Sequence, residues 1–359
     1  MIRASHVRYS HRVRSHRDRR EGGEGGSARG GGSDGEASLP VVVVGLGPIG
    51  RLTAAAALKH PDLELIGAVD PRHAGERFAA LVPGAPDGVV ERSAEALYRK
   101  ARGGIALICT GSTLDEVAPE VEAAVRAGVG VVSSCEELAN APFVDPELAG
   151  TLDAAARKSG VSILGAGIAP GFVLDRLVVT LGAVSGDVRL VVAERRVDAD
   201  PLGGATLDRL GIGIDPDRFG IRAEEGTVGH VGLAESCALV ADGLGLSVDE
   251  IEEEIEPIVA EVEIRCGERA IPPGKVHGVR QVAKALDEGR EVIRLTLEVA
   301  AGVSSRDRIR IDGDPPIEVE IPSGIDGPRA TAWSLVHAAP RVAASEPGIL
   351  SVLDLPAGR

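Results

Sequence analysis

The sequence predicts an α/β fold: a doubly wound parallel sheet followed by an α+β domain. Three observations predict it. A glycine-rich turn joins a buried strand to a helix near residue 45, strands and helices alternate from there to residue 164, and longer strands dominate the second half. The chain has 359 residues, which suggests roughly two domains at about 150 residues each.

Composition excludes several classes of protein. Hydrophobic residues make up 44% of the chain, which is enough for a core, and no apolar run approaches the ~20 residues of a membrane span. A net charge of −15 argues against a body that coats nucleic acid. The four cysteines are far apart, without a C-x-x-C pair, so we expect neither a zinc site nor a disulfide framework, and a cytoplasmic location.

Residues 1–39 form a separate segment that is rich in arginine and glycine. They contain few apolar residues, so we expect a disordered tail, and no apolar stretch of the kind found in signal peptides. The arginines could contact nucleic acid or another anionic surface. We favour the alternative, an inert extension or a start codon placed too far upstream.

The body opens on the sequence VVVVGLGPIG at residues 41–50, a buried strand running into G-x-G-x-x-G, with a helix predicted at 51–59. Gly45 permits the tight turn, Gly47 lets the backbone approach a pyrophosphate, and Gly50 lets helix and strand pack closely. This order of elements is typical of a Rossmann domain that binds NAD or NADP. A glycine turn without a cofactor is the weaker alternative.

The second strand, at 63–69, ends at Asp70, twenty residues after Gly50. A carboxylate there would accept hydrogen bonds from the ribose hydroxyls of NAD and repel the 2′-phosphate of NADP. Arg72 could instead stack on adenine or bind that phosphate, so both cofactors remain open.

Further strands are predicted at 105–109, 129–132 and 161–164, with helices at 115–127 and 146–159 between them. In a parallel sheet, ligands bind beyond the carboxyl ends of the strands. The glycine turn, residues 110–113 and residues 133–137 should therefore border one site. The residues expected to bind the cofactor are Gly45, Leu46, Gly47, Pro48, Ile49, Gly50, Asp70, Arg72, Thr110, Gly111 and Ser112.

The second half begins with a glycine-rich hinge at 165–172 and a helix at 173–181. Strands at 187–197, 262–266, 292–301 and 317–321 predict a mostly antiparallel sheet whose exposed face suits dimerisation. The acidic run 251–256 is interpreted as a solvated helix face, and 329–345 as a last helix. The predicted domains are a tail at 1–39, a Rossmann domain at 40–168, a substrate and dimerisation domain at 169–328, and a helix and tail at 329–359 that pack on the first domain.

No Ser-His-Asp arrangement or metal-ligand cluster stands out, which suits hydride transfer because the cofactor performs the difficult step. Glu136 and Glu137, at a strand end, are the candidate acid/base residues, and Glu136 is preferred. His230 lies among glycines at a predicted helix start and is a candidate for binding or proton relay. By strand alternation either Arg195 or Arg196 points inward, to bind a substrate carboxylate or to pair with Asp198, and we favour the pairing.

From about residue 40 to residue 356, the sequence resembles the 2,4-diaminopentanoate dehydrogenases and related native amine dehydrogenases, proteins often described as dihydrodipicolinate-reductase-like. The motifs that carry the resemblance are SCEEL at 134–138, GAGIAPGF at 165–172, GTVGHVGL at 226–233, RIRIDGDPPI at 308–317 and APR at 339–341. The resemblance implies a nicotinamide-binding Rossmann domain, a homodimer and reversible oxidative deamination of an amine. It places the catalytic glutamate at Glu136, with Glu137 in reserve, and a family histidine at His230.

The chain departs from the family pattern at positions that affect the substrate. Ala169 stands where the family has Asn before Pro-Gly-Phe, Asp326-Gly327-Pro328 where it has His-Gly-Asp, and His337 where it has Asn. The expected activity is NAD(P)-dependent dehydrogenation of a small amine or amino-acid derivative, with a ketone and ammonia as products. The alternatives are an imine or carbonyl reductase resembling dihydrodipicolinate reductase, although its His-His-x-x-Lys signature is missing, and a non-catalytic NAD(P)-binding protein.

Overall fold

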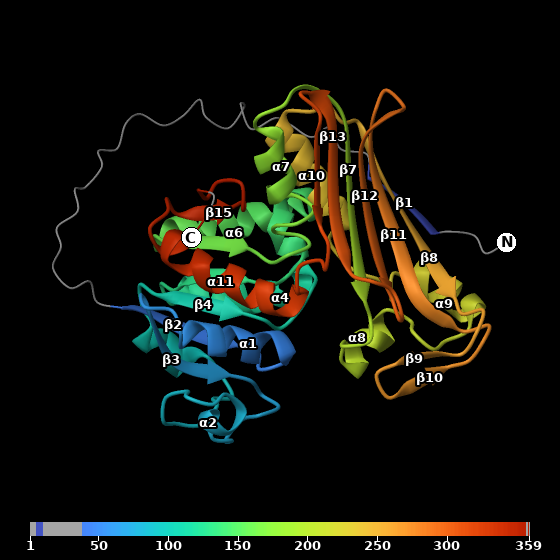
Figure 1. Ribbon diagram of the computed structural model, residues 1–359. Coiled ribbons are helices and arrows are strands. Elements are labelled where there is room, and N and C mark those ends of the chain that lie inside the picture. Colours follow the sequence, from blue (N-terminus) through green and yellow to red (C-terminus); the bar gives the residue numbers. More distant parts are fainter. Residues whose placement is uncertain (1–4, 10–37, 357, 359) are drawn as a thin grey trace. The chain divides into compact units, whose positions relative to one another are not determined.

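The structure, a computed structural model, describes residues 5–9, 38–356 and 358 (Figure 1). These residues fall into two compact units. Of the described residues, the parallel-sheet unit contains 38–171, 326–356 and 358, and the mixed-sheet unit contains 5–9 and 172–325. In these described residues no helix is both long and apolar enough to span a membrane.

The parallel-sheet unit is built on six parallel strands in the order β15-β6-β5-β4-β2-β3. The strands are β2 (Leu39–Val44), β3 (Leu63–Val69), β4 (Ile105–Ile108), β5 (Gly130–Ser133), β6 (Ser162–Gly165) and β15 (Gly348–Leu350). Its helical elements are α1 (Pro48–Ala57), α2 (Phe78–Leu81), α3 (Glu95–Lys100), α4 (Leu114–Arg126), η2 (Glu137–Asn140), α5 (Ala141–Val144), α6 (Pro146–Ser159) and α11 (Gly327–Ala343). The parallel sheet predicted from the glycine turn and the strand rhythm is confirmed.

Helices cover both faces of this sheet, so its central strands are buried along their whole length. Every residue of β4, β5 and β6 is buried. Helices α1 and α11 pack together on one face, and α4 packs beside α6 on the other. The apolar stripe of α4, residues Val117, Val121 and Val125, is fully buried in that core. The sheet edge that carries the loops is thereby held rigidly.

The mixed-sheet unit contains a seven-stranded sheet in the order β1-β8-β11-β12-β7-β13-β14, in which only β12 and β7 are parallel among the described strands. Its strands are β1 (Ser5–Tyr9), β7 (Gly186–Asp198), β8 (Glu250–Val259), β11 (Val276–Asp287), β12 (Arg290–Ala300), β13 (Arg306–Asp314) and β14 (Ile317–Ile321). The hairpin β9 (Ile264–Cys266) and β10 (Arg269–Ile271) is separate, and the helices are α7 (Arg176–Gly182), α8 (Gly204–Arg209), α9 (Pro216–Glu224) and α10 (Leu233–Leu244).

The predicted helix at the acidic run 251–256 is wrong, because these residues lie in strand β8. Ile251 and Ile255 are its buried residues, and a spacing of four is compatible with one face of a helix or of a strand. Pairing with β11 decides between them, since Lys284 lies opposite Glu252 and forms an ion pair with Glu254 at 2.9 Å. Strands β11 and β13 were not among the predicted elements.

Strand β1 lies inside the segment 1–39 that was expected to be a disordered tail. Its five residues pair antiparallel with β8, from Ser5 opposite Ile255 to Tyr9 opposite Ile251. The other residues of that segment, apart from Ser38 and Leu39, lie outside the described residues.

Candidate cofactor and catalytic site

The glycine turn between β2 and α1 is closed by contacts that only glycine allows. Gly45 has a φ of 87°, and its backbone N–H donates to the Val69 carbonyl at the end of β3. A Cβ at Gly50 would lie 1.7 Å from the Gly45 carbonyl oxygen, so the start of α1 must pack directly on the turn. A Cβ at Gly47 would meet nothing within 4 Å. Gly47 therefore faces open space at the N-terminus of a ten-residue helix, where a pyrophosphate would fit.

Asp70 is 1% exposed and its carboxylate ties the turn to β3. Its Oδ2 accepts the backbone N–H of Leu46 at 2.8 Å, and its Oδ1 accepts that of Arg72 at 2.9 Å. Burial alone would raise the pKa of Asp70, but these two N–H groups and the Arg72 guanidinium outweigh it and hold the pKa below its usual value. The carboxylate is therefore charged and internally paired.

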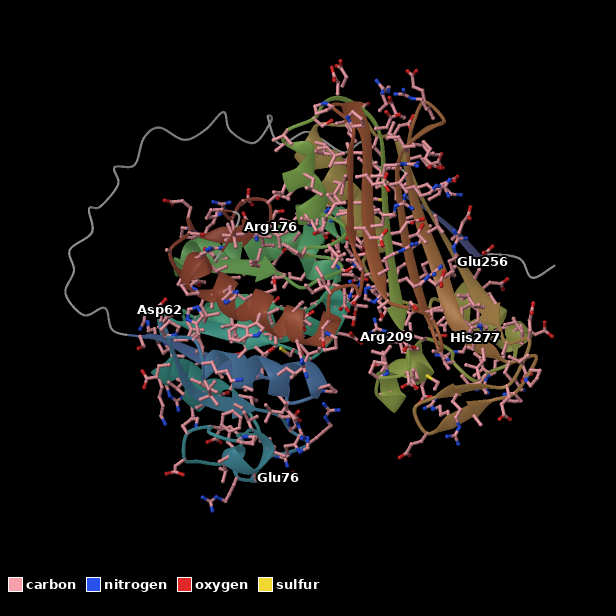
Figure 2. All side chains as sticks on the ribbon, in the orientation of Figure 1. Asp62, Glu76, Arg176, Arg209, Glu256 and His277 are labelled. Carbon is pink, nitrogen blue, oxygen red and sulfur yellow. The ribbon has the colours of Figure 1, made fainter. Side chains whose placement is uncertain are left out.

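The side chain of Arg72 lies beside this carboxylate, and that of Arg51 lies against the turn. The Arg72 side chain is 77% exposed, with its Nε 3.5 Å from Asp70 Oδ1. Arg51, in the first turn of α1, donates to the Leu46 carbonyl at 2.9 Å and contacts His73 Nε2 at 3.2 Å. His73 in turn contacts Glu76, which is labelled in Figure 2. The exposed guanidinium of Arg72 thus lies beside the turn.

The loops that follow β4 and β5 lie against each other, as predicted from the parallel sheet. The Cys109 N–H donates to the Val44 carbonyl, and the Ser134 N–H donates to the Ile108 carbonyl. The Glu137 N–H donates to the Ser112 carbonyl at 3.2 Å. A Cβ at Gly45 would lie 2.9 Å from the Thr110 side chain, so the glycine turn also borders this loop. The structure thus brings Gly45–Gly50, Thr110–Ser112 and Glu136–Glu137 together at one edge of the sheet.

The two adjacent glutamates have different surroundings. Glu137 Oε2 accepts the backbone N–H of Leu114 at 2.6 Å, which gives the first residue of α4 a partner. Burial raises the pKa of Glu137, and the neighbouring carboxylates of Asp115, Glu116 and Glu136 raise it further. Glu136 is half-buried and lies immediately before the short helix η2. Glu137 therefore supports the start of α4.

Cys135, which precedes the pair, is 1% exposed. Burial raises the pKa of its thiol to about 12, so the thiol is neutral near pH 7 and cannot serve as a base. The segment owes its position to Gly165, where a Cβ would lie 2.3 Å from the backbone of Leu138 and Ala139. The Ala166 N–H also donates to the Ser133 carbonyl at 2.8 Å.

The rest of the motif 165–172 is a compact turn. Gly171 has a φ of 123°, and a Cβ there would lie 2.4 Å from the Gly167 nitrogen. Ala169 is half-buried in this turn and brings only a methyl group to it. The turn therefore depends on glycine at position 171 for its shape.

Two predicted substrate residues lie in the mixed-sheet unit. His230 is half-buried in the loop before α10, and the side chain of Gln281 holds its backbone. The predicted pairing of Arg195 with Asp198 is wrong. Arg195 is 5% exposed, and its Nη1 binds both carboxylate oxygens of Asp307, at 2.7 and 2.8 Å. Strand alternation points Arg195 inward, where β13 rather than its own strand supplies the partner.

Sequence reasoning missed Asp307 and Gln281. Both are polar residues that the structure places on buried faces of strands, at 1% and 4% exposure. A polar residue between apolar residues at alternate positions of a strand indicates a buried polar group. This pattern could not be used here, because β11 and β13 were not predicted as strands. Among the described residues, no group of three or more His, Cys, Asp or Glu is arranged to hold a metal ion.

Comparison with known proteins gives consistent results for most of the chain. Residues 172–359 match the family model of the 2,4-diaminopentanoate dehydrogenase C-terminal domain. A 2,4-diaminopentanoate dehydrogenase of Acetoanaerobium sticklandii is 30% identical over 347 residues, covering 89% of this chain and 94% of that protein. An amine dehydrogenase of Streptomyces virginiae is 24% identical, covering 89% and 96%.

Among solved structures, the amine dehydrogenase from Mycobacterium smegmatis has the same fold. Its TM-score is 0.81 at 21% identity, over 90% of this chain and 97% of that one.

Proposed function

We propose that this chain, which belongs to the 2,4-diaminopentanoate dehydrogenase family of NAD(P)-dependent amine dehydrogenases, catalyses the reversible oxidative deamination of a small amine or amino-acid derivative. The proposed substrate resembles 2,4-diaminopentanoate, and the proposed acid/base residue is Glu136. Glu137 is the alternative candidate for the acid/base role. His230 and the turn at Ala169 are proposed to contribute to substrate binding. The supporting observation is the pair of adjacent carboxylates after β5, one of which is bound to the start of α4.

The proposed chemistry requires one base at the edge of the sheet. When bound at the glycine turn, the nicotinamide cofactor would supply the hydride acceptor for amine oxidation and the hydride donor for the reverse reaction. Glu136 first takes a proton from the substrate ammonium, since only the neutral amine can become an iminium. Once that proton has passed to solvent, the carboxylate takes a proton from the water that adds to the iminium. Protonation of the amino group then lets ammonia leave as the ketone forms. The products are ketone, ammonium, NAD(P)H and a proton.

The direct test is a spectrophotometric assay at the absorbance of NAD(P)H. Purified protein is mixed with NADH or NADPH, ammonia and a panel of ketones, and in the reverse direction with NAD+ or NADP+ and a panel of amines. Oxidation of NAD(P)H that requires both ammonia and a ketone supports the proposal. Ammonia-independent reduction of a C=N or C=O compound would support a reductase, and cofactor binding without turnover would support a non-catalytic protein.

We propose further that the enzyme accepts NADP as well as NAD. Both carboxylate oxygens of Asp70 already accept backbone N–H groups, so the charge that would repel a 2′-phosphate is partly neutralised within the protein. The exposed guanidinium of Arg72 can bind that phosphate.

Replacing Arg72 by alanine tests this preference. We expect the Kd for NADPH to rise about 10-fold or more, since a hydrogen bond to a charged group contributes about 1.5–3 kcal/mol, with little change in the Kd for NADH. Fluorescence titration of both reduced cofactors measures the two constants. Arg99→Ala, in the last turn of α3, is the exposed arginine control. Equal losses for both cofactors would contradict a phosphate-binding role.

Two glycine substitutions separate cofactor approach from folding. Gly47→Ala adds a methyl group where nothing lies within 4 Å, so we expect unchanged thermal stability but weaker NAD(P)H binding, because the methyl would meet the pyrophosphate. Gly50→Ala adds its Cβ 1.7 Å from a backbone oxygen and should lower the melting temperature. Calorimetry and cofactor titration measure both effects. Unchanged cofactor binding by Gly47→Ala would contradict the proposed pyrophosphate position.

A homodimer is proposed through the open face of the seven-stranded sheet. Three glutamates of β8 and three arginines of β13 lie on this same face, because the strand registers from β8 to β13 align them. The glutamates are near one edge of the sheet and the arginines near the other. They are Glu252, Glu254 and Glu256 (the last labelled in Figure 2), and Arg306, Arg308 and Arg310. A twofold axis that lies in the interface and runs parallel to the strands would set the acidic row of one copy against the basic row of its partner. Sedimentation equilibrium should therefore give twice the monomer mass, and Arg308→Glu combined with Arg310→Glu should weaken the dimer.

A further inference from the structure

The loop that carries His230 is shaped by glycine and held against the sheet. Gly226, Gly229 and Gly232 have φ values of 66°, 109° and 109°, a region that other residues rarely adopt. The Gly229 N–H donates to the carbonyl of Arg209, which is labelled in Figure 2. A Cβ at Gly229 would lie 2.4 Å from Ile255 Cδ1 and 3.1 Å from Gln281 Oε1. The loop can therefore approach β8 and β11 only with glycine at this position.

Gln281 of β11 binds the backbone of His230 on both sides. Its Oε1 accepts the His230 N–H at 2.6 Å, and its Nε2 donates to the His230 carbonyl at 2.8 Å. The same Nε2 donates its second hydrogen to Glu253 Oε1 at 3.0 Å. All three bonds require one orientation of the amide, since a flipped amide would set its NH2 group against the His230 N–H.

Glu253, on the neighbouring strand β8, supports this arrangement in a site shielded from water. Its partner Gln281 is 4% exposed, so a lost bond would leave buried polar groups unpaired. Burial raises the pKa of Glu253 to about 7, although its bond from Gln281 opposes the shift. In either protonation state the carboxyl group retains an oxygen that can accept from Nε2.

We propose that Gln281 is a positioning residue for the amine dehydrogenase reaction: it fixes the backbone of His230, and Glu253 fixes the orientation of the Gln281 amide. This inference rests on the proposed role of His230 in substrate binding. Gln281 acts through the histidine and is not itself placed against the substrate. Its removal should therefore affect substrate binding more than turnover.

The kinetic test compares variants in the full-length protein. We expect Gln281→Leu to raise the KM for the amine about tenfold with a smaller change in kcat, and Gln281→Asn, which keeps the amide on a shorter side chain, to fall between it and the wild type. Glu253→Gln keeps an acceptor oxygen and should change KM less than twofold. The matched control is Thr296→Val, a nearly isosteric change at another buried polar position of the sheet, where the hydroxyl has no hydrogen-bond partner in the described part of the chain.

A double variant distinguishes positioning from an independent effect. His230→Ala should raise KM, and adding Gln281→Leu to it should cause no further increase, because the group being positioned is already absent. An unchanged KM in Gln281→Leu, or effects of the two changes that multiply, would overturn the proposal. An unchanged KM in His230→Ala, with normal amine turnover, would instead remove the proposed role of the histidine.

Hydrogen exchange provides a readout that does not depend on turnover. The His230 amide should exchange at least tenfold faster in Gln281→Leu than in the wild type and in Thr296→Val, because its acceptor has been removed. Equal rates would show that Gln281 does not hold the loop and would overturn the proposal. If the wild type has no amine-dependent activity, the proposed function fails, and the positioning role of Gln281 in that reaction fails with it. The exchange rates would still show whether Gln281 holds the backbone of His230.

Discussion

Substituting Glu136 by glutamine is expected to lower kcat for amine oxidation by about 10²–10⁴-fold, the usual contribution of a positioned general acid or base. Glutamine keeps the size of the side chain and its hydrogen-bonding capacity but cannot take a proton from the substrate ammonium. The binding of NAD(P)H should be unchanged, because the glycine turn and the loop after β3 are not altered. Steady-state kinetics and cofactor titration measure the two quantities.

Glu137→Gln is the matched control, since it makes the same chemical change one residue away. The Glu137 side chain accepts the Leu114 N–H, and a glutamine oxygen can accept the same bond. We expect its kcat to fall by less than tenfold, and its stability by no more than about 1 kcal/mol, the range of charge effects at a helix N-terminus. Loss of activity in Glu137→Gln alone would reverse the assignment within the pair. Retention of activity in both variants would rule out a carboxylate base at this segment.

The glycine turn and the alternating first half could be predicted because their signals are local. Gly45 and Gly50 fulfil steric requirements within their own turn, and the parallel direction of the strands follows from the alternation of strands and helices. The role of Asp70 could be predicted only in part. Its position at the end of β3 was visible in the sequence, but its bond to Leu46 depends on how the turn folds back over the strand.

The second half was harder because its contacts join distant strands. The predicted partner of Arg195 was Asp198 on the same strand, whereas the actual partner, Asp307, lies 112 residues away. In the acidic run, charge suggested a solvated helix, but the pairing of β8 with β11 places Glu253 beside a buried amide. These contacts depend on which strands pair and in which register, and a local pattern in the sequence does not specify either.

Removing the guanidinium of Arg195 is expected to destabilise the protein by about 3–5 kcal/mol, the usual cost of leaving one charge of a buried ion pair without its partner. Asp307 is 1% exposed and would keep only the Ile325 N–H, which its Oδ2 accepts at 2.8 Å. The Ile325 carbonyl would also lose the Arg195 Nη2 that now donates to it at 2.7 Å. Urea unfolding of Arg195→Ala, followed by circular dichroism, measures the loss.

The neighbouring residue provides a close control for this prediction. Arg196 lies on the same strand and pairs with Glu298 at 2.9 Å, but its side chain is 43% exposed. Arg196→Ala should therefore cost less than about 1 kcal/mol, as exposed ion pairs do. Replacing both members of the buried pair, as Arg195→Met with Asp307→Leu, should cost less than Arg195→Ala, because no unpaired charge remains in the core. If Arg195→Ala and Arg196→Ala destabilise the protein equally, burial of the ion pair does not determine its contribution to stability.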